Sequence, residues 1–176
     1  MKHKKLTAVL EWYDSLIFSL AVIMVVFVFF IRVATVYQHS MEPTLYEGNR
    51  VAIQSLLYTP KDGDVVVVDG FIDYGKPLVK RIIATEGETV DIDFTAGIVY
   101  VNGAALVEPY VAAPTTRSGD VTFPLTVPEG KVFVMGDNRM NSKDSRNSEI
   151  GCVDKRDILG KVMYRTYPFN EMGVIQ

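Results

Sequence analysis

The sequence predicts a mainly β protein: antiparallel β-sheets in a barrel-like, folded-sheet domain, preceded by one N-terminal transmembrane helix. Two observations lead to this prediction. An apolar run near the N-terminus has the length of a bilayer span, and the chain after it shows short β-rich segments between regular turn signals. We therefore divide the chain into a cytoplasmic tail (residues 1–15), a transmembrane anchor (16–36) and an extracytoplasmic domain (37–176).

The anchor is predicted from a stretch, residues 16–31, that contains no charged side chain. As a helix, residues 16–36 would span about 30 Å, the thickness of a bilayer's hydrocarbon core. Arg32 lies near one end, where its long side chain can reach the headgroups. Aromatic residues that suit a membrane interface flank the run on both sides: Trp12, Tyr13 and Tyr37.

Two alternatives to a retained anchor were weighed. A buried helix of a soluble protein rarely has an uncharged run of this length. A cleaved signal peptide would have a basic start, which Lys2, Lys4 and Lys5 provide, but its apolar region is usually only about 7–15 residues long. The same three lysines place the N-terminus in the cytoplasm, because basic residues favour that side of the membrane.

Composition excludes several classes of function. A net charge of -3 gives no basic surface for nucleic acid. Cys152 is the only cysteine, so no internal disulfide is possible, and the only histidines are His3 and His39. We therefore predict no metal site and no cofactor.

Strand signals follow one another through the second part of the chain. Val65–Val68 reads as a buried strand after a turn, and residues 77–84 are a strand pattern interrupted by Lys80 and Arg81. Residues 89–94 alternate apolar and acidic side chains, and Asn102-Gly103 after a β-branched run predicts a hairpin. Residues 131–138 and 157–169 are further strands, whereas residues 112–120 read as an exposed loop.

Ser40 is a candidate nucleophile if a base can take its proton. His39 is its neighbour in sequence, but adjacent residues of an extended chain point in opposite directions. Lys80 is the better candidate, because Leu78 and Ile82 share its predicted strand face and burial lowers the pKa of an ammonium group. Arg81 cannot serve, because a guanidinium does not deprotonate in proteins. Taken alone, Lys80 would be read as an ordinary edge-strand lysine.

Residues 136–146, GDNRMNSKDSR, combine two aspartates and two arginines in one loop. By itself this pattern describes a solvated loop with Asx turns, or a charge network that holds a loop beside an active site.

Four boxes in order resemble the type I signal peptidase family, in its short bacterial form. They are SMEPTL at residues 40–45, GDVVVV at 63–68, the Lys80-Arg81 pair, and the loop at 136–146. Each box is weak alone, but the set in this order is specific. The resemblance implies a membrane-bound serine endopeptidase that removes signal peptides from exported preproteins.

The resemblance also implies roles for individual residues. Ser40 would be the nucleophile, Lys80 the general base, and Ser142 the residue that orients the lysine. Asp144 and Arg146 would form a supporting pair with Asp137 as a partner of Arg146, the Ser40 backbone N–H would stabilise the oxyanion, and Gln38 stands where some relatives have a second oxyanion donor. Met41 and Leu45 are expected to contact substrate or lipid.

The expected partners are signal-peptide-bearing preproteins, the lipid bilayer and the secretion translocon. Two other functions are alternatives at this point. One is an inert membrane-anchored β-domain that acts as an assembly scaffold. The other is a self-cleaving repressor with the same Ser-Lys chemistry, for which the sequence offers no DNA-binding helix-turn-helix.

Overall fold

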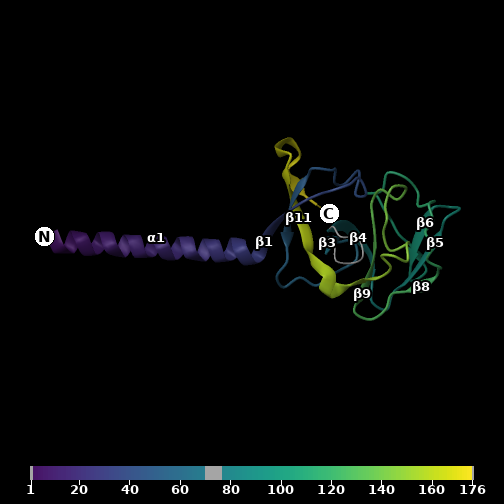
Figure 1. Ribbon diagram of the computed structural model, residues 1–176, viewed down its shortest axis with the longest axis horizontal. Helices are drawn as coiled ribbons and strands as arrows, with labels where there is room; N and C mark the ends of the chain where they lie inside the picture. Colours follow the sequence, from purple (N-terminus) through teal and green to yellow (C-terminus); the bar gives the residue numbers. More distant parts are fainter. Residues whose placement is uncertain (1, 70–76, 176) are drawn as a thin grey trace.

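A computed structural model describes residues 2–69 and 77–175 of the chain. One long helix, α1 (Lys2–Phe30), extends away from a β domain that contains the rest of the described chain (Figure 1). Among the helices of this described part, none meets both the length and the apolar character that crossing a bilayer requires.

The segment after the helix differs from the sequence-based expectation. Helix α1 ends at Phe30, and β1 (Ile31–Thr35) pairs antiparallel with β2 (Arg50–Gln54). The prediction of a helix up to Val36 is therefore wrong for residues 31–36. Ile31, Val33 and Thr35 are β-branched, which favours an extended backbone once a neighbouring strand can accept its hydrogen bonds.

The larger sheet has eight strands in the order β1-β2-β11-β3-β4-β9-β10, with β12 added alongside β11. All its pairs are antiparallel, as the sequence predicted for the domain. Its remaining strands are β3 (Val65–Val68), β4 (Leu78–Thr85), β9 (Lys131–Met135), β10 (Val153–Asp154), β11 (Ile158–Tyr167) and β12 (Gly173–Val174), and two short 3-10 turns, η1 (Lys155–Asp157) and η2 (Phe169–Glu171), flank β11.

The smaller sheet has four strands in the order β7-β6-β5-β8 and lies at the end of the domain farthest from α1 (Figure 1). Its strands are β5 (Thr89–Asp93), β6 (Ile98–Val101), β7 (Ala104–Ala105) and β8 (Leu125–Thr126). Asn102 and Gly103, with φ of 51° and 79°, form the two-residue turn between β6 and β7. The predicted hairpin is therefore confirmed.

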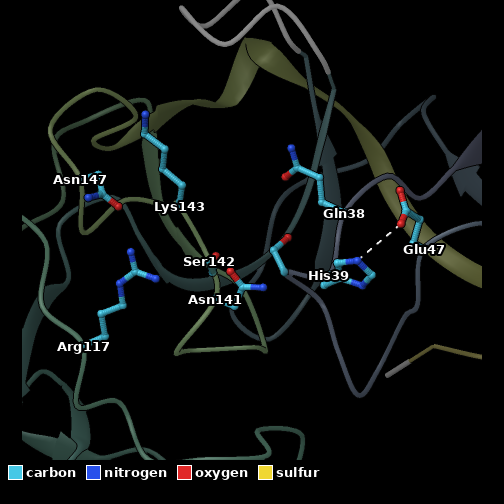
Figure 2. A pocket seen from close by; sticks show the side chains of 9 residues that line it. Gln38, His39, Glu47, Arg117, Asn141, Ser142, Lys143 and Asn147 are labelled. Carbon is cyan, nitrogen blue, oxygen red and sulfur yellow. Dashed lines mark ion pairs between the residues drawn. The ribbon is translucent and has the colours of Figure 1, made fainter.

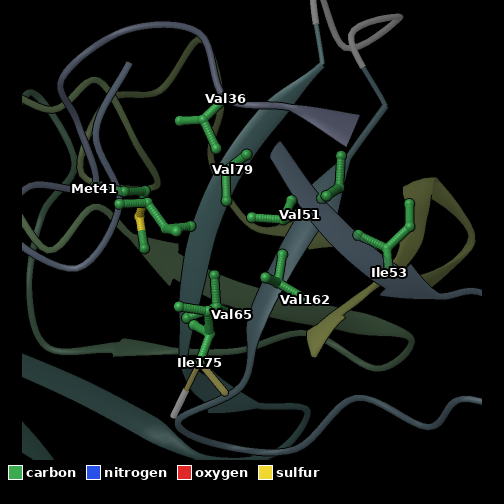
Figure 3. Packing of buried hydrophobic residues seen from close by; sticks show 10 residues of the cluster. Val36, Met41, Val51, Ile53, Val65, Val79, Val162 and Ile175 are labelled. Atoms are coloured by element: carbon green, nitrogen blue, oxygen red, sulfur yellow. The ribbon is translucent and has the colours of Figure 1, made fainter. Parts of the chain in front are cut away.

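The central strands of the larger sheet are buried on both faces. In β3, Val65 and Val67 pack into one apolar cluster, shown in Figure 3, while Val66 and Val68 pack into another. All residues of β4 from Leu78 to Ala84 are buried. Any polar side chain in this strand is therefore removed from water, whichever face it points to.

Candidate active site

The side chains of Ser40 and Lys80 meet in the structure. The Lys80 Nζ lies 2.6 Å from the Ser40 Oγ, within hydrogen-bond distance. Lys80 is in the middle of β4, in register with Val66 of β3. Ser40 begins a compact turn after β1, in which the Leu45 N–H donates to the Met41 carbonyl. The structure thus brings together the two residues that the sequence selected.

Lys80 is held in an environment that disfavours its charge. Its side chain is buried, with the residue only 1% exposed. Burial lowers the pKa of Lys80 from 10.5 to about 8; the carboxylate of Asp144 opposes this shift, and the positive charge of Arg146 adds to it. The shift corresponds to roughly 3 kcal/mol against the charged form. A substantial fraction of the lysine is therefore neutral at mildly alkaline pH.

The residues two before and two after Lys80 in β4 are buried, as the strand pattern predicts. Leu78 and Ile82 pack in the same buried cluster as Val66, the register partner of the lysine. Val79 packs in a different cluster, on the other face of the strand. Apolar clusters therefore cover both faces of β4, and the lysine side chain is kept from water.

Asn138 fastens the turn that carries Ser40 to the polar loop after β9. The backbone N–H of Asn138 donates to the Ser40 carbonyl at 3.0 Å, and its side-chain amide donates to the His39 carbonyl at 3.1 Å. These two bonds fix the backbone on both sides of the Ser40 amide. The nucleophile is therefore positioned by a loop far away in sequence, since Asn138 and His39 are 99 residues apart.

Asp137 pairs with Arg81, which corrects the expectation that it would pair with Arg146. The Arg81 guanidinium donates to both Asp137 oxygens at 2.8 Å, and the Thr44 hydroxyl donates to the same carboxylate at 2.5 Å. All three groups come from different segments: β4, the polar loop and the turn after Ser40. A bidentate pair of this kind is strong and directional, so it ties these segments together.

Asp144 and Arg146 form the other buried pair. The guanidinium of Arg146 donates to both carboxylate oxygens, at 2.8 and 2.9 Å, and also to the carbonyls of Arg117 and Arg139. The Gly136 N–H donates to the same carboxylate at 3.0 Å. Burial alone would raise the pKa of Asp144, but these bonds and the charge of Arg146 outweigh it and the pKa is lowered.

Ser142 is buried beside the Ser40–Lys80 pair. A Cβ atom added to Gly136 would lie 2.3 Å from the Ser142 Oγ and 2.4 Å from the Ser40 carbonyl oxygen, so both serines lie against this glycine. Within the described residues, the Ser142 Oγ has no hydrogen-bond partner of ordinary geometry. Its expected role in orienting the lysine therefore stays a prediction.

The residues expected to stabilise an oxyanion remain available. Among residues 2–69 and 77–175, no hydrogen bond engages the Ser40 backbone N–H, which leaves it free to donate. Gln38 has a φ of 76°, a value in the left-handed region that few side chains adopt, and its exposed side chain lines the pocket in front of Ser40. Neither residue's oxyanion role is tested by this geometry.

Met41 and Leu45 are buried in the protein, whereas the sequence-based expectation placed them at a surface that meets substrate or lipid. Their exposed fractions are 1% and 0%, and both belong to the apolar cluster that contains Val36 and the β3 residues Val65 and Val67 (Figure 3). The turn after Ser40 curls so that these side chains point into the core. Their role is to hold the turn against the sheet.

His39 is exposed and engaged with carboxylates. Its Nδ1 lies 2.8 Å from the Glu42 Oε1, and its Nε2 lies 3.5 Å from Glu47. The hydrogen bond to Glu42 raises the pKa of His39. The geometry agrees with the expectation that this histidine does not serve Ser40.

Sequence reasoning missed the contacts of the segment between β7 and β8, residues 108–117, which we call the strap. The Arg139 guanidinium donates to the Glu108 carboxylate at 2.5 Å and to the Thr115 hydroxyl at 2.8 Å. The Arg81 guanidinium carbon lies 3.9 Å from the centroid of the Tyr110 ring. The predicted exposed loop at residues 112–120 is thus fastened at Thr115. No local signal identifies these contacts, because each joins residues far apart in the sequence.

A polar pocket of about 620 Å³ opens in front of Ser40 and Ser142. Figure 2 shows Gln38, His39 and Glu47 on one side of it, and Arg117, Lys143 and Asn147 on the other. It can receive an extended peptide with its carbonyl at Ser40. In the part of the chain that the structure describes, no group of three or more histidine, cysteine or acidic side chains is arranged to hold a metal ion.

Comparison with known proteins gives consistent matches. The family described as "Signal peptidase, peptidase S26" matches residues 9–167. Signal peptidase I of Bacillus licheniformis is 35% identical over 96% of this chain and 94% of its own length, and signal peptidase I T of Bacillus subtilis is 34% identical over 96% and 91%. The crystal structure of a signal peptidase I from Enterococcus faecalis superposes with a TM-score of 0.52 at 32% identity, covering 60% of this chain and 98% of that one.

Proposed function

The chain belongs to the signal peptidase family, peptidase S26, and from that premise we propose that Ser40 and Lys80 cleave signal peptides from exported preproteins. The observation that carries the assignment of the two residues is the 2.6 Å contact between the Lys80 Nζ and the Ser40 Oγ. A buried amine beside a hydroxyl is the arrangement that Ser-Lys catalysis requires. No observation favours the inert scaffold.

The reaction proceeds in two halves. Neutral Lys80 takes the proton of the Ser40 hydroxyl as its oxygen bonds to the carbonyl carbon of the scissile peptide. The Ser40 N–H donates to the oxyanion that forms, and the ammonium of Lys80 then protonates the departing amine. This leaves the signal peptide esterified to Ser40. Lys80, neutral again, takes a proton from the water that attacks the ester carbonyl, and its ammonium then returns this proton to the Ser40 oxygen as the ester bond breaks, which releases the signal peptide with a free carboxyl group.

The surrounding charges have positioning roles in this proposal. Asp144 and Arg146 hold the backbone of Gly136 and its loop, and Asp137 holds Arg81 next to the lysine. Ser142 lies close enough to the pair to orient the amine once substrate excludes water, and Gln38 is the candidate for a second oxyanion donor.

Cleavage of a preprotein in detergent tests the assignment. We expect Ser40→Ala and Lys80→Ala to lose activity by several orders of magnitude, and Lys80→Arg to be equally inactive because it cannot accept a proton. His39→Gln, which alters the neighbouring exposed side chain, is the matched control and should retain most activity. An active Lys80→Arg protein would contradict proton abstraction by this residue.

In this proposal the apolar part of α1, residues 16–30, anchors the protein in the membrane, with residues 1–15 in the cytoplasm and the β domain outside. Its support is the uncharged apolar run and the three lysines before it. Confinement to the membrane plane brings the enzyme to cleavage sites that emerge beside the bilayer. We expect the protein to stay with the membrane during alkaline extraction. We also expect protease added outside intact cells to digest the β domain. Full extraction at alkaline pH would reject the anchor.

A further inference from the structure

We propose that Arg117, with Lys143 beside it, makes the enzyme favour substrates that carry an acidic side chain close to the scissile bond. This inference rests on the proposed function and specifies the substrate class. It starts from the uneven distribution of charge around the pocket in front of Ser40. Figure 2 shows Arg117 and Lys143 on the side opposite to Glu47.

Arg117 carries charge that the protein itself does not neutralise. One of its guanidinium nitrogens donates to the Met140 carbonyl at 2.8 Å, and no carboxylate pairs with it among residues 2–69 and 77–175. A guanidinium has five N–H donors, so most of them remain for a ligand. The residue is exposed and lines the pocket in front of Ser40, where a substrate carboxylate can form a bidentate pair with it.

The backbone of Arg117 is fixed, which prepares the side chain for binding. Its carbonyl accepts from Arg146 at 2.8 Å, and Thr115, two residues earlier, is buried and accepts from Arg139. The bond to Met140 further restricts the guanidinium itself. Less conformational entropy is therefore lost when a carboxylate binds.

The other charges of the pocket are already paired. Lys143 is bonded to Glu149, and Glu47 faces the Nε2 of His39 at 3.5 Å. Lys143 therefore adds to the positive field of this side without being its main source. The unbalanced charge belongs to Arg117, and a substrate carboxylate complements it.

The effect on specificity follows from the exposure of the site. A solvent-exposed ion pair contributes up to about 1 kcal/mol, which corresponds to about a fivefold preference at 25 °C. The preference should weaken as ionic strength rises, because the Debye length falls to about 3 Å in 1 M salt. The expected discrimination is thus modest, charge-dependent and sensitive to salt.

The experiment uses the full-length protein in detergent and quenched fluorescent peptides with alanine at positions three and one before the cleaved bond. One other position at a time, from five before to four after the bond, carries Asp, Asn or Lys. The readout is the ratio of kcat/KM for the Asp and Asn peptides, in which any loss of active enzyme cancels. We expect a ratio of about five at one or two adjacent positions.

Three variants identify the residue responsible. Arg117→Gln should bring the ratio close to one, Arg117→Lys should keep most of it, and Arg117→Glu should invert it so that the Lys peptide is preferred. Arg156→Gln removes another exposed arginine, one that pairs with Asp154 outside the pocket, and should leave the ratio unchanged.

A ratio of one at every position in the native enzyme, with efficient cleavage of the Asn peptides, would overturn this inference alone. A ratio that survives Arg117→Gln, or that is insensitive to salt, would overturn it as well. Failure of the native enzyme to cleave any of the Asn peptides would instead reject the proposed function, and this inference with it.

Discussion

Gly136→Ala is the substitution that tests most directly how the active site is packed. The new Cβ would lie 2.3 Å from the Ser142 Oγ, 2.4 Å from the Ser40 carbonyl oxygen and 2.7 Å from the Ser142 Cβ. Real contacts of this kind are about 3.4 Å or longer, so Gly136 and the Ser40 backbone must separate by roughly 1 Å. The φ of Gly136 is not positive, so the effect is steric and does not come from backbone strain.

A displacement of this size should be costly for catalysis. Misplacement of a reacting group by about 1 Å can reduce the rate about 100-fold, and Ser40 is held by Asn138 from the same loop. We therefore expect kcat for preprotein cleavage to fall by about two orders of magnitude. The protein should still fold, with a loss of stability of about 1–3 kcal/mol, as for other overpacked sites.

The assay measures kcat on a quenched signal-peptide substrate and the midpoint of urea unfolding for each protein. Gly173→Ala is the matched control, because no atom lies within 4 Å of its added Cβ and its φ is not positive. We expect no change in kcat for this control. If Gly136→Ala folds and cleaves within threefold of the native rate, the close contact of Gly136 with the nucleophile does not govern catalysis.

Three further predictions concern the dyad and its neighbour. Because the pKa of Lys80 is lowered to about 8 and its neutral form is the base, kcat/KM should rise with pH and level off above about pH 8; a flat profile from pH 6 to 9 would contradict this. Lys80→Met should abolish activity and yet stabilise the fold at pH 7 by up to about 3 kcal/mol in urea unfolding, because the charge is no longer buried. The pKa of Lys80 is lower in the folded protein than in the unfolded chain, so the unfolded chain binds more protons between about pH 8 and 10.5. The native protein therefore becomes more stable as pH rises through this range, and the stability advantage of Lys80→Met disappears there. Ser142→Ala should reduce kcat at least about tenfold while lowering the free energy of unfolding by no more than about 1 kcal/mol, the net contribution of one hydrogen bond; a loss of stability as large as the loss of activity would mean a structural role.

Much of the domain was predictable from local patterns. The run of valines in β3, the alternation in β5 and the Asn102-Gly103 turn each specify their structure within a few residues. These signals are local because side-chain alternation and turn chemistry depend on neighbours in sequence. β1 and β2 were not predicted, since β1 continues an apolar run that also suits a helix.

The errors at the site have a common origin. Asp137 was expected to pair with Arg146 because both lie in one loop, but it pairs with Arg81 of β4. Met41 and Leu45 were expected at a surface, but the turn directs them into the core. In each case the residue type was recognised correctly from the sequence, but the path of the folded chain determined which residues it contacts.

Ser40, Lys80 and the charged loop are recognisable in the linear chain, because nucleophile, base and network depend on residue type and order. Three features arise only on folding. They are the burial of the Lys80 amine, its 2.6 Å contact with the Ser40 hydroxyl, and the position of Arg117 at the pocket. Burial and contact are properties of segments that meet from distant parts of the chain. They depend on the register of β4 between β3 and β9 and on how closely Gly136 lets the loop approach, neither of which a local pattern encodes.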